Sequence, residues 1–259
     1  MAFPPTGRWR FVVPNAITCT SLALGLVSIM QSFAGHYESA AWFILMCVLL
    51  DKLDGSVARA LNASTKIGVQ LDSFSDLVTF GIAPGFLYLG LTTKDPRFAA
   101  FWAGETMQLV TTCACLFLGV MAALRLAKFN VMTEEVGSKI FLGVPTTLVG
   151  GVSASFYLTA EKYAFPPVFV AMVPVMLVVF GLWMVSNIPL PKIRTTSSKA
   201  YNIFMGGNAL ATYVLIAFRI IPEIPFLQSS LYLLVGTGYA LTYMKDEWQP
   251  FTGSGREAA

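Results

Sequence analysis

Apolar residues run along this chain in long stretches that proline, glycine and charged residues interrupt at intervals. A helix needs about 20 mostly apolar residues to cross a bilayer. The pattern predicts eight such helices, and every segment between them is too short to fold as a soluble domain. The predicted helices cover residues 14–34, 38–60, 67–92, 98–126, 142–160, 167–186, 205–221 and 227–243. The sequence therefore predicts an all-α integral membrane protein.

The composition agrees with this prediction. Of the 259 residues, 56% are hydrophobic and only 12% are charged, whereas soluble domains carry about 25% charged residues. Such a composition excludes a water-soluble globule and a disordered chain. A net charge of +3 without a dense basic run argues against a nucleic-acid partner. The four cysteines lie in apolar stretches and lack the spacing of a zinc or disulfide framework.

The distribution of basic residues predicts the orientation in the membrane. If the N-terminus is cytoplasmic, 13 of the 17 lysines and arginines fall on the inner side, as the positive-inside rule requires. An even number of spans places the C-terminus on the same side. The chain then divides into an amphipathic cytoplasmic arm (residues 1–13), a transmembrane domain that carries the chemistry (14–243) and a cytoplasmic tail (244–259).

Four of the six aspartates lie within one 26-residue window, at Asp51, Asp54, Asp72 and Asp76. A carboxylate in hydrocarbon costs several kcal/mol, so these side chains must face the protein interior and find partners there. Asp51 and Asp54 are three residues apart, and Asp72 and Asp76 are four apart, so each pair shares one face of a helix. A short turn at 62–64 would let two helices present both pairs to a common centre.

Carboxylates gathered in this way need cations or protons to offset their charge. Two divalent cations would balance four carboxylates, and oxygen-only ligation favours Mg²⁺ or Mn²⁺. With Arg59 and Lys66 beside them, such cations would form a pocket suited to a pyrophosphate and to phosphoryl transfer at the cytoplasmic boundary. The alternative interpretation is structural, with the aspartates forming interhelical ion pairs with Lys52, Arg59 and Lys66.

The third predicted helix contains two glycines and a proline close together. Gly81 and Gly85 are four residues apart, with Pro84 between them. This pattern predicts close packing against another helix or a kink.

The spacing of these residues resembles the complete signature of the CDP-alcohol phosphotransferase family. The matching pattern is Asp51-x₂-Asp54-Gly55-x₂-Ala58-Arg59-x₈-Gly68-x₃-Asp72-x₃-Asp76. The resemblance implies an integral membrane enzyme with a six-helix core, usually a homodimer. Such an enzyme uses an alcohol to displace CMP from a CDP-linked lipid.

The resemblance also implies roles for individual residues. Asp51, Asp54 and Asp72 would be metal ligands, and Asp76 would both contact a metal and act as the general base. The CDP-lipid would be bound by residues of the signature, by residues of a Pro-Asn-x-x-Thr segment and by the basic residue just before the third predicted helix. These residues are Gly55, Ala58, Arg59, Gly68, Asn15, Thr18 and Lys66. For Asn15 and Thr18, a role at the start of the first helix remains an equal alternative.

Four further segments are similar to the bacterial and archaeal phosphatidylserine synthases within this family: residues 71–84, 125–130, 143–145 and 186–189. This similarity implies transfer from CDP-diacylglycerol to L-serine, giving phosphatidylserine and CMP. The serine carboxylate would need a cation, for which Arg125 and Lys128 are candidates, with Asn130 as a hydrogen-bond partner. The alternative for the two basic residues is ordinary anchoring at the inner boundary.

These expectations leave two groups of alternatives open. Another acceptor, such as glycerol 3-phosphate, inositol or inositol phosphate, or an archaeal-type lipid donor would use the same chemistry. A divalent-cation transporter would use the same aspartates as an ion pathway. The expected location is a bacterial inner membrane, with the active site near its cytoplasmic face.

Overall fold

The computed structural model describes residues 6–135, 140–192 and 198–243. The predicted tail (244–259) and the first five residues of the predicted arm lie outside these ranges, and residues 6–13 belong to the first helix. The described chain is all-α apart from one short sheet. In chain order the elements are α1 (Thr6–Ala34), α2 (Tyr37–Ala60), α3 (Lys66–Asp76), the π-helix η1 (Leu77–Ile82), α4 (Ala83–Lys94), α5 (Pro96–Ala99), the 3₁₀ turn η2 (Ala100–Trp102), α6 (Glu105–Glu135), β1 (Ile140–Leu142), α7 (Thr146–Lys162), α8 (Pro167–Ala171), α9 (Val173–Val185), β2 (Pro189–Pro191), α10 (Lys199–Ala217) and α11 (Glu223–Tyr243).

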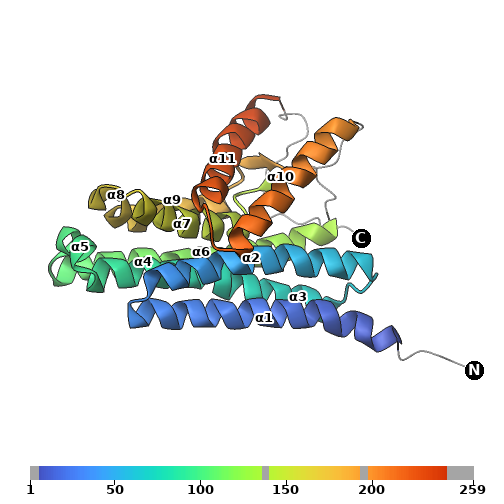
Figure 1. Cartoon of the computed structure of the whole chain (residues 1–259), viewed down its shortest axis with the longest axis horizontal. Coiled ribbons are helices and arrows are strands. Elements are labelled where there is room, and N and C mark those ends of the chain that lie inside the picture. Colours follow the sequence, from blue (N-terminus) through green and yellow to red (C-terminus); the bar gives the residue numbers. More distant parts are fainter. Residues whose placement is uncertain (1–5, 136–139, 193–197, 244–259) are drawn as a thin grey trace, which may run out of the picture.

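Each of the eight predicted helices coincides with a helical segment of the described chain. Among the described residues, four segments are long and apolar enough to cross a membrane by themselves: Arg10–Ala34, Lys66–Lys94, Glu105–Val131 and Lys199–Ala217. The chain is thus an all-α integral membrane protein, as predicted. For the remaining segments, a full crossing stays a prediction. Helices α1, α2, α3–α4 and α6 run along the long axis of the molecule, and α10 and α11 are inclined to them (Figure 1).

Several predicted helix boundaries were wrong. The predicted helix 98–126 continues to Glu135, and the predicted helix 205–221 covers Lys199–Ala217. Two other differences have a clear local reason. The fourth helix was predicted to begin at residue 98, but α6 begins at Glu105 because Gly104, with a φ of +95°, interrupts the helical path. The predicted helix 167–186 is divided at Met172, because Pro174 follows and cannot continue the hydrogen bonding of α8. The predicted helix 142–160 begins only at Thr146.

The third helical segment changes its winding in the middle. A six-residue π-helix, η1, joins α3 to α4 and ends directly before Ala83 and Pro84. Proline lacks an N–H group, and its ring clashes with the carbonyl four residues earlier in an α-helix. A wider π turn avoids that clash, so Pro84 explains the position of η1. The kink predicted from Pro84 therefore takes the form of a π segment.

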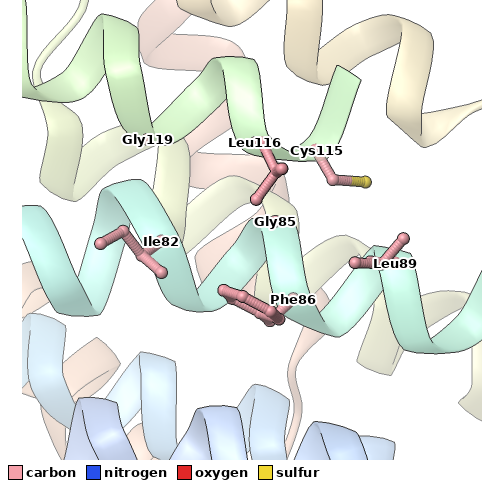
Figure 2. A pocket seen from close by; sticks show the side chains of 7 residues that line it. All are labelled: Ile82, Gly85, Phe86, Leu89, Cys115, Leu116 and Gly119. Atoms are coloured by element: carbon pink, nitrogen blue, oxygen red, sulfur yellow. The ribbon is translucent and has the colours of Figure 1, made fainter. Parts of the chain in front are cut away.

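The glycines of this segment allow α6 to approach closely. A methyl group at Gly81 would lie 2.6 Å from the side chain of Ala122, and one at Gly85 would lie 2.5 Å from the backbone oxygen of Cys115. The predicted close packing at these two glycines is confirmed. A small apolar cavity beside this contact is lined by residues of η1, α4 and α6, among them Phe86 and Leu116 (Figure 2). It contains no polar side chain suited to the predicted chemistry.

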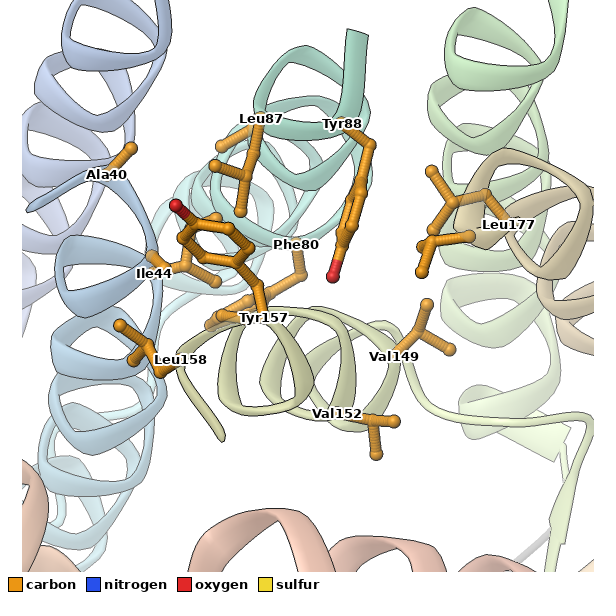
Figure 3. Close-up of a cluster of buried hydrophobic side chains, with 14 of the residues drawn as sticks. Ala40, Ile44, Phe80, Leu87, Tyr88, Val149, Val152, Tyr157, Leu158 and Leu177 are labelled. Atoms are coloured by element: carbon orange, nitrogen blue, oxygen red, sulfur yellow. The ribbon is translucent and has the colours of Figure 1, made fainter. Parts of the chain in front are cut away.

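The buried core lies where α7 meets η1, α4, α2 and α9. Phe80, Tyr88 and Leu177 are fully buried there and lie around α7 (Figure 3). Gly150 of α7 lies directly against Phe80, since a methyl group at this glycine would come within 2.7 Å of the Phe80 ring. Tyr88 donates its hydroxyl hydrogen to the carbonyl of Ser153 at 2.7 Å. The core therefore fixes α7 relative to η1, which directly follows the predicted site on α3.

Two short strands, which the hydrophobic pattern did not predict, hold the beginning of α7. β1 and β2 pair antiparallel, with Phe141 opposite Leu190. Gly143 follows β1 with a φ of +76° and donates its N–H to the carbonyl of Ile188 at 2.9 Å. Its α-carbon faces the backbone oxygen of Met184, which leaves no room for a side chain. A glycine is therefore required at 143 for the chain to turn from β1 into α7.

This requirement gives a first prediction. Gly143→Ala is expected to destabilise the protein by about 2–4 kcal/mol, because it adds backbone strain and a contact with a carbonyl that cannot move away. Thermal unfolding of the purified protein in detergent measures the loss. The matched control is Gly207→Ala in α10, where a methyl group meets nothing within 4 Å and the change in stability should stay within about 1 kcal/mol. Equal stability of Gly143→Ala and the natural protein would contradict the proposed turn.

The opposite end of the bundle carries a cluster of ion pairs. Arg97 contacts Asp95 at 2.8 Å and Glu161 at 3.0 Å. Partial burial opposes ionisation of Asp95, but hydrogen bonds from Arg97 outweigh it and hold the pKa of this carboxyl below its ordinary value. Lys162 pairs with Glu223 at 2.7 Å. These contacts tie the ends of α4, α7 and α11 together.

Candidate active site

The turn between α2 and α3 sets the relative position of the two helices that carry the aspartates. It lies at residues 61–65, where the sequence predicted it, and Asn62 adopts a left-handed conformation with a φ of +47°. Thr65 then begins α3 by accepting a hydrogen bond from the N–H of Gly68 at 2.9 Å. Helix α1 packs against both α2 and α3. The three helices thus enclose the faces on which the predicted site residues lie.

The carboxylates of Asp51, Asp72 and Asp76 converge at this place. One oxygen atom from each lies within 4.8 Å of the others, and all three residues are half-buried. Asp54 lies one turn further along α2, where it is buried and accepts a hydrogen bond from the Thr18 hydroxyl at 2.7 Å. The structure therefore brings three of the four aspartates to one point and holds the fourth against α1.

The converging oxygens fit a hard divalent cation. Three carboxylates cannot stay ionised this close together without positive charge between them, and an all-oxygen donor set is the one that Mg²⁺ and Mn²⁺ prefer. The structural alternative predicted ion pairs from these aspartates to nearby basic residues. Within the described ranges, no ion pair joins them to Lys52, Arg59 or Lys66. A metal centre explains the geometry better than interhelical ion pairs do.

Helix α1 supplies two of the residues expected to bind the CDP-lipid. The buried hydroxyl of Thr18 joins α1 to Asp54. Asn15 lies beside α3, because a methyl group at Gly68 would come within 3.1 Å of its side-chain oxygen. The Pro-Asn-x-x-Thr segment thus lies against both halves of the signature. It does not begin the helix, since α1 starts at Thr6 and Pro14 is inside it.

The remaining residues expected to bind the CDP-lipid lie on α2 and α3 near the turn that joins them. Arg59 is exposed and extends back over Gly55, where a methyl group would lie 3.4 Å from the guanidinium. Its side chain also donates to the hydroxyl of Ser56 at 3.3 Å. Lys66 is exposed at the first position of α3, and Ala58 is half-buried on α2. Two cations therefore flank the turn, with glycine and alanine leaving space beside the carboxylates.

The three residues predicted to bind serine all lie on α6, but in different surroundings. Arg125 is buried and donates to the hydroxyl of Thr146 at 3.1 Å, and this hydroxyl lies 3.4 Å from the carboxylate of Asp76. Lys128 donates to the carbonyl of Val185 and to the side chain of Asn187, at the end of α9.

The third of them, Asn130, joins α6 to α3. Its amide donates to the hydroxyl of Ser73 at 3.0 Å, and Ser73 follows Asp72 directly. Among the three, Arg125 is the residue that faces the carboxylates. Sequence reasoning did not single out Thr146, whose hydroxyl connects Arg125 to Asp76, and the only signal for it was its place after the Gly143–Pro145 segment.

Comparison with known proteins shows the family in which this arrangement of residues occurs. Residues 11–188 match the model of the CDP-alcohol phosphatidyltransferase family. This range covers most of α1, the helices that carry the aspartates, α6, α7 and α9. The chain belongs to this family. Members of the family depend in general on a metal ion, and the aspartate cluster provides a place for one.

Several similar proteins carry names that specify a reaction. A CDP-diacylglycerol–serine O-phosphatidyltransferase of Helicobacter pylori is 29% identical over 71% of this chain and 73% of its own length. A Bacillus subtilis protein of the same name is 34% identical over 53% of this chain and 71% of its own length. An archaetidylserine synthase of Methanothermobacter thermautotrophicus is 30% identical over 70% of each chain. The similar proteins therefore include serine-dependent synthases named for both bacterial and archaeal lipids.

Proposed function

We propose that this protein transfers the phosphatidyl group from CDP-diacylglycerol to the hydroxyl of L-serine, giving phosphatidylserine and CMP. The observation that carries the proposal is the convergence of Asp51, Asp72 and Asp76 within 4.8 Å, inside a chain that belongs to the CDP-alcohol phosphatidyltransferases. The names of the similar bacterial proteins support serine as the acceptor. Membership of this family favours an enzyme over a divalent-cation transporter.

In this proposal the serine hydroxyl attacks the phosphorus on the lipid side of the pyrophosphate. The new bond joins the serine oxygen to that phosphorus, and the bond from the phosphorus to the bridging oxygen of CMP breaks. Asp76 takes the proton from the serine hydroxyl as the bond forms. CMP departs with the electron pair of the broken bond, and the diacyl chains stay in the membrane throughout.

Residues of α1, α2 and α3 would bind the cytidine and the phosphates of CDP-diacylglycerol. Asn15, Gly55, Ala58 and Gly68 would border the cytidine, because small side chains leave room for the base. Arg59 and Lys66, both exposed beside the turn, would hold phosphate oxygens, for which guanidinium and ammonium groups are suited. Thr18 would act through Asp54, which its hydroxyl already contacts.

Two divalent cations, Mg²⁺ or Mn²⁺, would complete the site. Asp51, Asp72 and Asp76 are the residues that would share one of them, and Asp54 would contribute to the second. When bound, the cations neutralise the pyrophosphate charge and the negative charge that develops on the leaving CMP.

Serine would bind on the α6 side of the carboxylates. Arg125 is the cation best placed for its carboxylate, because Arg125 is the α6 residue that faces Asp76. Lys128 and Asn130 would set the width of this side of the site, since they tie α6 to α9 and to α3. The proposal thus divides the three predicted serine residues into one contact and two supports.

The proposed setting is a bacterial inner membrane with both termini in the cytoplasm and a homodimer as the working unit. The excess of basic residues on one side of the predicted spans supports the orientation. In this orientation the carboxylates would lie near the cytoplasmic face, where serine would arrive and CMP would leave.

Acceptor and donor choice can be tested in one assay. CMP release by the purified protein is measured with L-serine, glycerol 3-phosphate, inositol or inositol phosphate, each offered with CDP-diacylglycerol or with a CDP-linked archaeal-type lipid. We expect release with serine to exceed that with every other acceptor at least tenfold. Release that depends on another alcohol would overturn the choice of serine, and preference for the archaeal-type donor would overturn CDP-diacylglycerol. No release with any pair would overturn the proposed reaction.

A further inference from the structure

A single hydroxyl group connects the buried arginine of α6 with the proposed general base. Arg125 donates from its Nη1 to Oγ1 of Thr146 at 3.1 Å, and Thr146 Oγ1 lies 3.4 Å from Oδ2 of Asp76. An arginine can only donate hydrogen bonds, so the threonine oxygen must accept from it. The one hydrogen of the hydroxyl is then free to point toward the carboxylate. The two hydrogen bonds run in one direction, from Arg125 through Thr146 to Asp76.

The position of Thr146 depends on the turn that precedes it. Gly143 is held by its hydrogen bond to Ile188, Val144 is fully buried, and Pro145 comes directly before the first residue of α7. Thr146 itself is fully buried. A buried threonine in a helix commonly satisfies its hydroxyl with a carbonyl of its own helix, as Thr159 does in α7 at 2.7 Å. At the first position of α7 the hydroxyl of Thr146 points instead to two residues of other helices.

The hydrogen bond from Thr146 holds the Asp76 carboxylate in one orientation. A carboxylate that accepts a hydrogen bond on one oxygen is fixed in rotation, and its other oxygen is held in a defined direction. The same hydroxyl oxygen accepts a hydrogen bond from Nη1 of the buried Arg125. Asp76 is therefore oriented by a group that need not touch the substrate.

We propose that Thr146 is a positioning residue, whose hydroxyl sets the orientation of Asp76 and thereby the rate of proton removal from the acceptor alcohol. This inference rests on the proposed function for the role of Asp76. It does not depend on which alcohol is the acceptor, because the hydrogen-bond chain reaches the base and not the acceptor.

The test compares three variants of the full-length protein. Thr146→Val keeps the shape of the side chain and removes the hydroxyl, and Thr146→Ser keeps the hydroxyl. Thr159→Val makes the same isosteric change in the same helix, at a buried hydroxyl that donates to the carbonyl of Ser155 in α7. For each variant, kcat and the KM for serine are measured by CMP release, Mn²⁺ binding is measured by electron paramagnetic resonance, and thermal unfolding reports on the fold.

We expect Thr146→Val to lower kcat about 10- to 100-fold, the range found when groups that orient a site are removed, and to change the KM for serine less than threefold. Thr146→Ser should stay within about threefold of the natural protein, and Thr159→Val within about twofold. Mn²⁺ binding should survive in Thr146→Val, because Asp51 and Asp72 are unchanged.

Several results would overturn the inference. An unchanged kcat in Thr146→Val would show that the hydroxyl is dispensable, and an equal loss in Thr146→Ser would show that the hydroxyl is not the group that matters. A raised KM with an unchanged kcat would place Thr146 in serine binding, and lost Mn²⁺ binding would place it in the metal site. Failure of the proposed function would appear differently, as no serine-dependent release by the natural protein. The ratio of variant to natural protein would then be measured with whichever acceptor is active.

Discussion

Asp76→Asn is expected to lower kcat at least about 1,000-fold, the upper part of the range for loss of a general base. Asparagine has the size of aspartate and keeps one oxygen beside Asp51 and Asp72, but it cannot take a proton. The KM for CDP-diacylglycerol should change less than tenfold, because the residues proposed to hold the nucleotide and the pyrophosphate are untouched. Steady-state CMP release with varied donor and acceptor measures both quantities.

The matched control is Asp95→Asn, the same substitution at the other end of the bundle. Asp95 pairs with Arg97, so its replacement should cost at most about 1 kcal/mol of stability and leave kcat within about twofold. An Asp76→Asn variant that turns over at nearly the natural rate would contradict both the general base and the assignment of the carboxylate cluster as the active site.

Removal of divalent metal should abolish CMP release, and addition of Mg²⁺ or Mn²⁺ should restore it. Asp51, Asp72 and Asp76 present their oxygens within 4.8 Å of one another, and the pyrophosphate adds further negative charge. Without cations the leaving CMP would develop its charge beside carboxylates, which raises the barrier. Loss of at least about 1,000-fold on treatment with EDTA is therefore expected, with recovery in a metal titration.

A single-site variant makes the metal prediction specific. Asp51→Asn should raise the Mg²⁺ concentration for half-maximal activity at least about tenfold, since removal of one charged ligand weakens binding. Asp95→Asn again serves as the control and should leave the titration curve unchanged. Full activity in protein shown by elemental analysis to be metal-free would contradict the proposed metal centre.

Local spacing in the sequence was sufficient to predict the centre of the site. Asp51 and Asp72 belong to separate helices, yet the turn at Asn62 is short and the periodicity on each side is clear, so their approach follows from helix geometry. The glycines at 81 and 85 were predictable in the same way, because a missing side chain in a membrane helix usually marks a close contact. The residues that predict these features all lie in one segment of the sequence, from Asp51 to Gly85.

Features that depend on distant segments could not be predicted in this way. The strand Ile140–Leu142 forms only because residues 189–191 lie beside it, and a three-residue strand has no periodicity to detect. Thr146 was predicted to lie inside the helix 142–160, and nothing in the local sequence indicates that Arg125 and Asp76 lie within hydrogen-bonding distance of its hydroxyl. Lys128 carried the right charge for serine, but the end of α9, 57 residues away, supplies its carbonyl partner.

The C-terminal helices support the site from outside the region that matches the family. α11 packs on β2, where the hydroxyl of Tyr232 donates to the carbonyl of Pro191 at 2.5 Å. Gly236 of α11 also lies against Pro191. β2 in turn pairs with β1, which leads into Gly143 and Thr146. Residues beyond 188 therefore contribute to the turn that places a hydroxyl next to Asp76.

The most direct test of the account is the fate of labelled serine. Purified protein in liposomes of CDP-diacylglycerol, with Mg²⁺ and ¹³C-labelled L-serine, is analysed by mass spectrometry of the lipid fraction and by chromatography of released CMP. The account predicts labelled phosphatidylserine and CMP in equal amounts, and neither product after EDTA or with Asp76→Asn. CMP release without label in the lipid, or no CMP while a different alcohol enters the lipid, would contradict it.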